Sequence, residues 1–234
     1  MRVTPMPAAP RQRRRPLLSR EEIVEAAARL LDREGYDALT MRRLAEELGV
    51  QAPALYWHVK SRNDLEGSLL DYLVADLELT PTGADWRDDV RRFAAQWRQF
   101  LKGKRDITRI CANLNVLGPN LLRHTDVMLG MLRRAGLSDR DAAYAWGYGV
   151  DYVFNFAGAE AAWCLPVADT GMTGDEILAE AGRSFAALPA ETYPNVVALA
   201  ADLTTAHDID ARFEFGVECL IAGIERRIGS AGTV

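Results

Sequence analysis

The spacing of apolar residues constrains the fold of this chain more than any other feature. Apolar side chains recur every three or four residues through nearly the whole sequence, and no stretch alternates convincingly at period two. Helix-capping signals precede several of these runs, as at Ser19 with Glu22 and at Thr173 with Glu176. Gly35 ends the run that Ser19 opens, and Gly49 ends the next one, because glycine adopts the left-handed C-terminal conformation at little cost. The pattern predicts an all-α protein.

A linker divides the predicted helices into two domains. Thr80-Pro81-Thr82-Gly83 has the composition of a linker, so we expect one domain over residues 19–79 and a second over 84–229. Residues 1–18 are rich in proline and arginine, which predicts a disordered basic arm. The expected helices cover residues 19–34, 40–48, 51–58, 62–78, 86–101, 120–135, 138–163, 174–187, 194–205 and 208–228.

Several classes of protein need residue patterns that this chain lacks. The three cysteines lie far apart and form no Cys-x-x-Cys pair, so we expect free thiols and neither a disulfide framework nor a zinc site. No nucleophile elbow, P-loop or dinucleotide fingerprint occurs, which argues against an enzyme. Residues 142–168 are apolar but contain Asp151, Asn155 and Glu160, which favours a buried helix over a membrane span. Without a visible secretory signal, we expect a cytoplasmic protein.

The charge is divided unevenly along the chain. The whole sequence has a net charge of −5, but residues 1–62 carry +4 and residues 63–234 carry −9. A basic end is typical of a surface that contacts phosphates. The arginine-rich run over residues 11–15 fits two interpretations, a solvated arm or an added DNA contact, and both stay open.

Residues 39–58 have the layout of a helix-turn-helix, with two short helices joined by a tight turn at Gly49. Leu44, Leu48 and Leu55 are spaced to pack the two helices together. This packing would leave Tyr56 and Trp57 on an outer surface that fits the DNA major groove, about 12 Å wide. Unrelated helical bundles share the pattern, and a Tyr-Trp-His run is also common in protein cores, so the pattern alone leaves both alternatives open.

Longer segments carry a resemblance to a known family. In the first domain these are Ile23-Val24-Glu25-Ala26-Ala27, Gly35-Tyr36-Asp37-Ala38-Leu39-Thr40, Arg42-Arg43-Leu44-Ala45, Leu48-Gly49-Val50 and Leu55-Tyr56-Trp57-His58-Val59-Lys60. With them, residues 19–79 resemble, without gaps, the DNA-binding domain of the TetR family of bacterial repressors, and in particular its tetracycline-repressor branch. Phe215-Gly216-Val217-Glu218 and Ile221-Ala222-Gly223-Ile224-Glu225 resemble the final dimerisation helix of the same branch.

The resemblance implies a set of DNA contacts. Arg42 matches an arginine that contacts guanine in the major groove, a contact that discriminates by about 1–3 kcal/mol. Ala52 and Ala54 stand where the branch has polar base-reading side chains, so we expect a different operator sequence. The candidate DNA-binding residues are Thr40, Arg42, Gln51, Ala52, Pro53, Ala54, Tyr56, Trp57, His58, Lys60 and Arg62.

The resemblance also implies a second domain with a ligand pocket and a homodimer interface. The helix over 138–163 combines many aromatic residues with polar Asp151 and Asn155, a mixture that suits a ligand site. That these aromatics simply form the core stays an alternative. The candidate ligand-binding residues are Trp97, Phe100, Asn113, Asn115, His124, Tyr148, Asp151, Tyr152, Asn155 and Trp163. The candidate dimer residues are Phe215, Gly216, Leu220, Ile221, Gly223 and Ile224.

The tetracycline-repressor branch holds a magnesium–drug complex through histidines and a glutamate. Cys111 and Asp151 occupy the two histidine positions here, so the resemblance does not carry that metal site over. We therefore expect no metal and no cofactor, and a bulky, flat, partly aromatic ligand such as a drug or natural product.

Together these expectations describe a ligand-released repressor. A dimer would read a palindromic operator, because two recognition helices about 34–36 Å apart fit successive major grooves. Ligand binding would shift the helix over 62–78, which tethers the DNA-binding domain, and would move the two DNA-binding domains of the dimer apart. An activator and a ligand-independent DNA-binding regulator have the same sequence features, and a purely structural helical adaptor is a further alternative.

Overall fold

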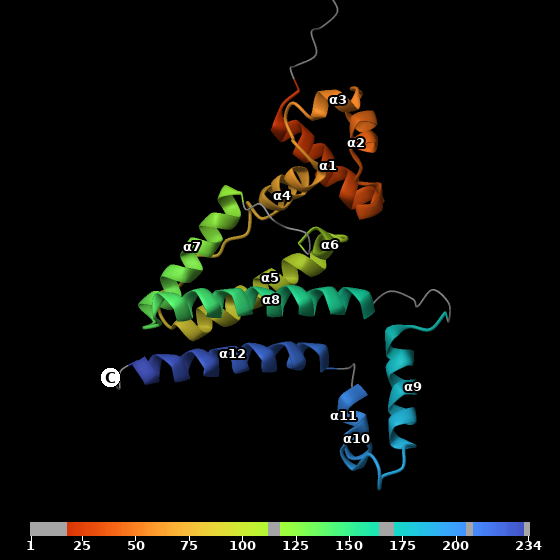
Figure 1. The fold of residues 1–234 in the computed structure, drawn as a ribbon, viewed down its shortest axis with the longest axis vertical. Coiled ribbons are helices and arrows are strands. Elements are labelled where there is room, and N and C mark those ends of the chain that lie inside the picture. Colours follow the sequence, from red (N-terminus) through yellow and green to blue (C-terminus); the bar gives the residue numbers. More distant parts are fainter. Residues whose placement is uncertain (1–17, 112–117, 164–170, 205–207, 232–234) are drawn as a thin grey trace, which may run out of the picture.

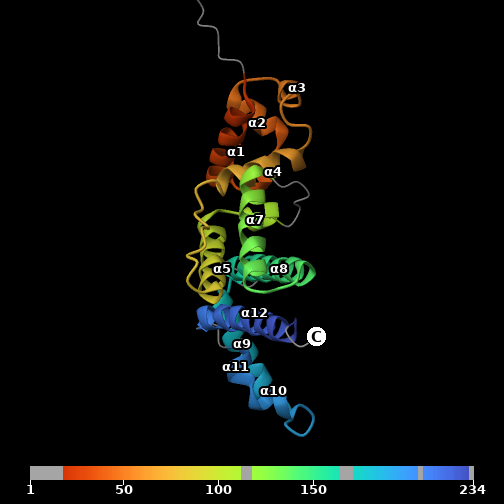
Figure 2. The ribbon, with the colours of Figure 1, turned by 90° about the vertical axis from the view of Figure 1, so that its left-hand side faces the viewer.

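The computed structural model describes residues 18–111, 118–163, 171–204 and 208–231. Within these ranges the secondary structure is helical and includes no strand, as the apolar spacing predicts. Figures 1 and 2 show a small helical domain at one end, a larger group of helices in the middle and a helical hairpin that projects from the other end. None of the described helices is both long and apolar enough to cross a membrane.

The small domain forms from local signals that the sequence displays. It contains α1 (Arg20–Glu34), the 3-10 turn η1 (Tyr36–Ala38), α2 (Met41–Leu48), α3 (Ala52–Leu55) and α4 (Arg62–Leu73). The predicted capping box is confirmed, since Ser19 Oγ accepts a hydrogen bond from the Glu22 amide at 3.1 Å and Glu22 accepts one from the Ser19 amide at 2.9 Å. Leu30, Leu44 and Leu55 are fully buried where α1, α2 and α3 meet.

Two helices of this domain are shorter than we expected. The segment 51–58 is helical only over α3, and the chain continues in a tighter turn in which the His58 amide bonds the Leu55 carbonyl. The tethering helix predicted over 62–78 ends at Leu73 as α4. Beyond it the backbone makes i to i+3 bonds, and this turn lets both Val74 and Leu79 be buried.

The larger group consists of α5 (Trp86–Gly103), α6 (Ile107–Cys111), α7 (Pro119–Arg134), α8 (Asp139–Trp163) and α12 (Ile209–Ala231). α8 packs against α5, α6, α7 and α12, and so forms the centre of this domain. The short helix α6 was not predicted from the sequence. It packs on α4 and on η1, and therefore links the two domains.

An ion cluster with a buried pair at its centre, Arg98 and Glu160, joins the central helices. Arg98 of α5 donates two hydrogen bonds to Glu160 of α8, at 2.8 and 2.9 Å, and pairs with Asp210 at the start of α12. Lys102 adds a second cation at 2.7 Å from Glu160. Although burial alone would raise the pKa of Glu160, the bonds from Arg98 and Lys102 lower it. The cluster thus holds α5, α8 and α12 in register.

The projecting hairpin consists of α9 (Gly174–Ala186), α10 (Pro194–Ala198) and α11 (Ala200–Thr204). Its helices pack mainly on one another. The single helix expected over 194–205 is divided at Leu199, whose backbone leaves the helical conformation. Leu199 and Leu203 are left at least half exposed.

Candidate functional sites

The turn between α2 and α3 holds the second helix in a fixed position. Thr40 caps α2 by accepting the Arg43 amide, and Gly49 ends it in the left-handed conformation at φ 65° and ψ 37°. Leu55 then anchors α3 in the core. Because α3 is bound on its inner side, its outer side and the turn after it face solvent.

Two large aromatic side chains project from the end of α3. Tyr56 is 51% exposed and Trp57 is 89% exposed. A tryptophan in water with so little contact gains nothing for the fold, so the alternative of a core Tyr-Trp pair does not hold for these two residues. Arg42 is also exposed, and its ion pair with Glu46, 3.1 Å away, is weak enough to be exchanged for another partner.

The other candidate DNA-binding residues lie around these aromatics with different exposure. The exposed ones are Thr40, Gln51, Pro53 and Lys60, and the half-buried ones are Ala52, Ala54, His58 and Arg62. His58 has its carbonyl bound by Arg20 at 2.8 Å, and the Lys60 amide is bound by Asp64 at 2.7 Å. These bonds fix the backbone that leads into α4.

Arg62 lies at the contact between the domains. Its guanidinium lies 4.5 Å from the centre of the Tyr36 ring, and that of Arg109 on α6 lies 4.4 Å from the same ring. Arg109 also donates two hydrogen bonds to Asp37, at 2.8 and 3.0 Å, and these lower the pKa of the Asp37 carboxyl. We call Tyr36, Asp37, Arg62 and Arg109 the α6 latch.

A second connection runs from α4 to α7. The Asp71 carboxylate is buried and accepts hydrogen bonds from the Leu121 amide at 2.9 Å and from the Asn120 side chain at 3.1 Å. The first turn of α7 is therefore bound to the last turn of α4. A Cβ at Gly118 would come within 2.2 Å of the Asp71 side chain, so the approach requires glycine.

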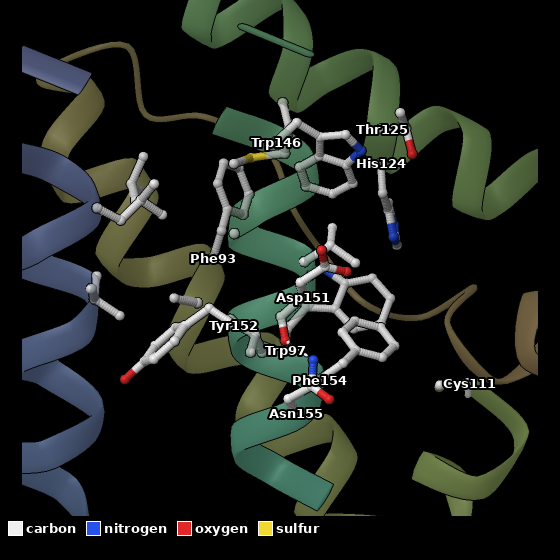
Figure 3. Close-up of a pocket in the computed structure, with 18 of the residues that line it drawn as sticks. Phe93, Trp97, Cys111, His124, Thr125, Trp146, Asp151, Tyr152, Phe154 and Asn155 are labelled. Carbon is white, nitrogen blue, oxygen red and sulfur yellow. Dashed lines mark hydrogen bonds between the residues drawn. The ribbon is translucent and has the colours of Figure 1, made fainter. Parts of the chain in front are cut away.

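Behind these two connections lies a cavity of about 830 Å³, within the size range of sites for small organic molecules. Phe93 and Trp97 enter from α5, His124 and Thr125 from α7, and Trp146, Asp151 and Phe154 from α8 (Figure 3). Thr108, Arg109 and Cys111 of α6 complete one wall. The lining is mainly apolar and aromatic.

The chemistry of the lining groups suits binding rather than reaction. Burial raises the pKa of the Cys111 thiol to about 12, so this cysteine is not a nucleophile at neutral pH. Burial lowers the pKa of His124, helped by the charge of Arg123, so its ring is neutral at pH 7. Within the described ranges, no three His, Cys, Asp or Glu side chains gather closely enough to hold a metal ion.

The cavity brings together half of the residues that the sequence suggested for it. Trp97, His124, Asp151, Tyr152 and Asn155 all line it. Phe100 lies behind Trp97, in an edge-on contact, and Tyr148 is 58% exposed on another side of α8. Asn113, Asn115 and the side chain of Trp163 lie outside the described residues.

Sequence reasoning missed several residues of the cavity wall. Phe93 and Met128 line it and were not among the candidates. Trp146 and Phe154 also line it; they belong to the aromatic set of the predicted helix over 138–163 but were not selected from it. For Phe93 a signal existed, since it precedes Trp97 by one helical turn and so shares its face. For Met128 nothing local distinguished it from a core residue.

The candidate dimer residues on α12 divide between two environments. Ile221 and Ile224 are buried within the subunit, Leu220 is half-buried, and Phe215 and Gly223 are exposed. Gly216 is approached by Tyr152 of α8, whose hydroxyl donates to the Phe213 carbonyl at 2.9 Å.

Exposed aromatic side chains also remain on α8. Tyr144 is 65% exposed and Tyr148 is 58% exposed. They lie four residues apart and so share one face of the helix. Together with Phe215, 72% exposed on α12, they leave aromatic surface on both of these neighbouring helices.

Comparisons with known proteins agree with this arrangement. Residues 23–66 match the bacterial regulatory proteins of the tetR family, and residues 80–228 match the tetracyclin repressor-like C-terminal domain. The chain is 33% identical over 212 residues to the class C tetracycline repressor protein of Escherichia coli, covering 89% of this chain and 91% of that protein. An HTH-type transcriptional regulator of Saccharopolyspora erythraea is 34% identical over 152 residues, which are 64% of each protein.

A solved structure is similar over nearly its whole length. ActR, a TetR family protein of Streptomyces coelicolor crystallised in complex with actinorhodin, superposes with a TM-score of 0.83 at 32% identity. The match covers 93% of this chain and 100% of that one.

Proposed function

Since the chain belongs to the TetR family of bacterial transcriptional regulators, we propose that it is a repressor that binds a palindromic operator as a dimer and releases it when a bulky aromatic molecule fills the cavity. In this proposal residues 19–79 form the DNA-binding domain and residues 84–229 form the ligand-binding and dimerisation domain. The exposed Tyr56-Trp57 pair after α3 is the observation that carries the proposal.

The DNA contacts follow from the position of these aromatics. With α3 in the major groove, Tyr56 and Trp57 meet bases and sugars, and Arg42 at the start of α2 reaches a guanine. Thr40, His58 and Lys60 lie toward the phosphates. The Arg62 side chain is bound in the α6 latch, so its phosphate contact requires that it leave Tyr36.

The cavity supports a flat aromatic ligand. Its volume of about 830 Å³ and its lining by Phe93, Trp97, Trp146 and Phe154 suit stacked rings. The structurally similar ActR was crystallised with actinorhodin, which supports the same kind of ligand here.

The two connections between the domains suggest how the ligand acts. Arg109 and His124 line the cavity, and each lies on a helix that is bonded to the DNA-binding domain, Arg109 through the α6 latch and His124 through the α7 turn that Asp71 holds. A ligand that displaces either helix moves α4 and, with it, the rest of the DNA-binding domain. To change operator affinity appreciably, the ligand must bind the DNA-free conformation of the protein better than the DNA-bound conformation by about 1–3 kcal/mol.

Dimerisation would use the exposed faces of α8 and α12. Tyr144, Tyr148 and Phe215 supply aromatic area. Gly223 has no side chain and faces open space, with nothing within 4 Å of a Cβ placed there, so a second backbone can approach it closely. A second copy that covers these faces gives the two DNA-binding domains the twofold symmetry that a palindromic operator requires.

The test is a titration of the full-length protein with duplex DNA from the upstream region of its own gene, followed by fluorescence anisotropy at two salt concentrations. We expect specific binding that weakens steeply with salt, because each phosphate contact releases counterions. Arg42→Ala should weaken specific binding by about tenfold or more, and Trp57→Ala should do the same.

Two matched variants serve as controls. Arg183→Ala removes an exposed arginine that, like Arg42, pairs with a glutamate on its own helix, and Tyr193→Ala removes an exposed aromatic of the hairpin. Neither should change operator affinity. Equal losses in the control and test variants, or binding without sequence preference, would show that α3 does not read DNA.

A further inference from the structure

Two buried polar atoms of the cavity wall have no hydrogen-bond partner among the described residues. They are Nε1 of Trp97 on α5 and Nδ1 of His124 on α7. Trp97 is 7% exposed and His124 is 3% exposed, and both line the cavity. Leaving a buried polar group unpaired is costly in a folded protein, so such atoms need a partner from within the cavity.

The two rings lie side by side. Their centres are 5.9 Å apart, and their planes meet at 83°, an edge-to-face arrangement. Figure 3 shows the two side chains on different helices, His124 on α7 and Trp97 on α5. A single oxygen that bonds both nitrogens at about 2.9 Å needs them within about 5.8 Å of each other, and rings whose centres are this close allow that.

The protonation state of each ring defines what a partner must offer. The indole Nε1–H of Trp97 is a donor only. The bond between the His124 ring and the Leu77 backbone raises the pKa of the ring, as a bond donated by the ring does. Because Nδ1 has no partner, we assign this donor to Nε2, and Nδ1 of the neutral ring is then an acceptor. The pair therefore combines one free donor with one free acceptor.

We propose that Trp97 and His124 form a subsite for a hydroxyl group of the ligand, which accepts from Trp97 Nε1 and donates to His124 Nδ1. This inference rests on the proposed function, since it assumes that the cavity is the ligand site. The ligand class becomes a flat aromatic compound with a free phenolic or alcoholic hydroxyl.

Other oxygen groups match the pair less well. A ketone, ether or ester oxygen accepts from Trp97 but has no proton for His124 Nδ1. A carboxylate has the same defect and must also lose its hydration in a mainly apolar cavity. Only a group that both donates and accepts satisfies the two rings at once, and hydroxyl is the smallest such group on an aromatic ligand.

The experiment compares three probes that differ at one position: 2-hydroxyanthraquinone, 2-methoxyanthraquinone and anthraquinone. Their affinities for the full-length protein are measured by equilibrium dialysis at pH 6.5, where the acidic hydroxyl of 2-hydroxyanthraquinone keeps its proton. We expect the hydroxy compound to bind about tenfold more tightly than the methoxy compound, because it alone pairs both nitrogens.

Three variants localise that preference. Trp97→Phe and His124→Phe keep an aromatic ring and lose the polar atom, so the preference for hydroxyl should fall to about twofold or less. His124→Asn keeps an acceptor near the position of Nδ1 and should retain most of it. Thermal unfolding of each variant establishes that it is folded, and anthraquinone binding reports whether the cavity keeps its shape.

The outcomes separate the subsite from the proposed function. Equal affinity for the three probes, or no binding of any of them, overturns the hydroxyl subsite, as does a preference that survives both phenylalanine variants. Operator binding by the wild-type protein is measured on the same preparation. If the protein binds its operator specifically, the proposed function stands even when the hydroxyl subsite is overturned.

Discussion

The DNA-binding domain and the cavity domain place their large side chains in opposite ways. The first packs aliphatic residues such as Leu30, Leu44 and Leu69 to zero exposure and turns Tyr56 and Trp57 outward. The second gathers its aromatics around a cavity of about 830 Å³ and leaves buried polar atoms unpaired beside it. The difference teaches that the fold of the first domain closes its own core, while the second domain leaves room and polar atoms that a ligand would complete under the proposed function.

Core truncation should show the largest contrast between the domains. Leu44→Ala opens a cavity in a fully packed core and should lower the free energy of unfolding by about 2–5 kcal/mol. Met128→Ala only enlarges an existing cavity, so its cost should be about 1–2 kcal/mol. Urea unfolding measures both. Equal losses would mean that the two cores are packed alike.

Gly216 of α12 is a place in the cavity domain where two helices pack closely. A Cβ there would lie 2.2 Å from the Tyr152 ring, so Gly216→Ala should destabilise by about 1–3 kcal/mol through overpacking. Gly147→Ala on α8 meets nothing within 4 Å and should stabilise by about 0.5–1 kcal/mol, because alanine favours the helix. Thermal unfolding of the two variants should therefore shift in opposite directions, and shifts of the same sign would contradict this account of α12 packing.

The α6 latch should couple the two domains. Asp37→Asn removes the charge that Arg109 binds, and Asp37 itself does not line the cavity. The amides of η1 and α6 should then exchange hydrogen a few-fold faster, because the segment opens more often. Asp32→Asn, an exposed change on α1, is the control and should leave that exchange unchanged. If both variants behave alike in hydrogen-exchange mass spectrometry, the latch does not join the domains.

The smallest effect should be a pH dependence at His124. Burial lowers its pKa below the usual 6.5, so the unfolded chain binds the proton more readily than the folded protein. Stability is therefore full above about pH 6.5 and falls as the pH drops through the lowered pKa of the folded state. His124→Asn should remove this part of the acid sensitivity, measured as the melting temperature between pH 7.5 and 5. An unchanged pH profile would show that His124 titrates normally.

Local signals made the small domain predictable. Ser19, Thr40 and Gly49 each act on backbone groups within a few residues, so their effect can be read from neighbouring letters. The ends of α3 and α4 were less predictable, because each is followed by a tighter turn with i to i+3 bonds, from Leu55 to His58 and from Val74 to Leu77, that no capping residue announces. The exposed position of Tyr56 and Trp57, which we propose to contact DNA, followed from the burial of Leu55.

The sequence by itself determined the helical class, the helix-turn-helix and the aromatic character of the second domain, because helix periodicity and capping are short-range. Only the tertiary structure decided which aromatics surround the cavity and which, like Tyr148, face solvent. It also decided that Trp97 and His124 stand together with one free donor and one free acceptor. These relations depend on how α5, α7 and α8 pack across long sequence separations, and no local pattern encodes the distance between two helices.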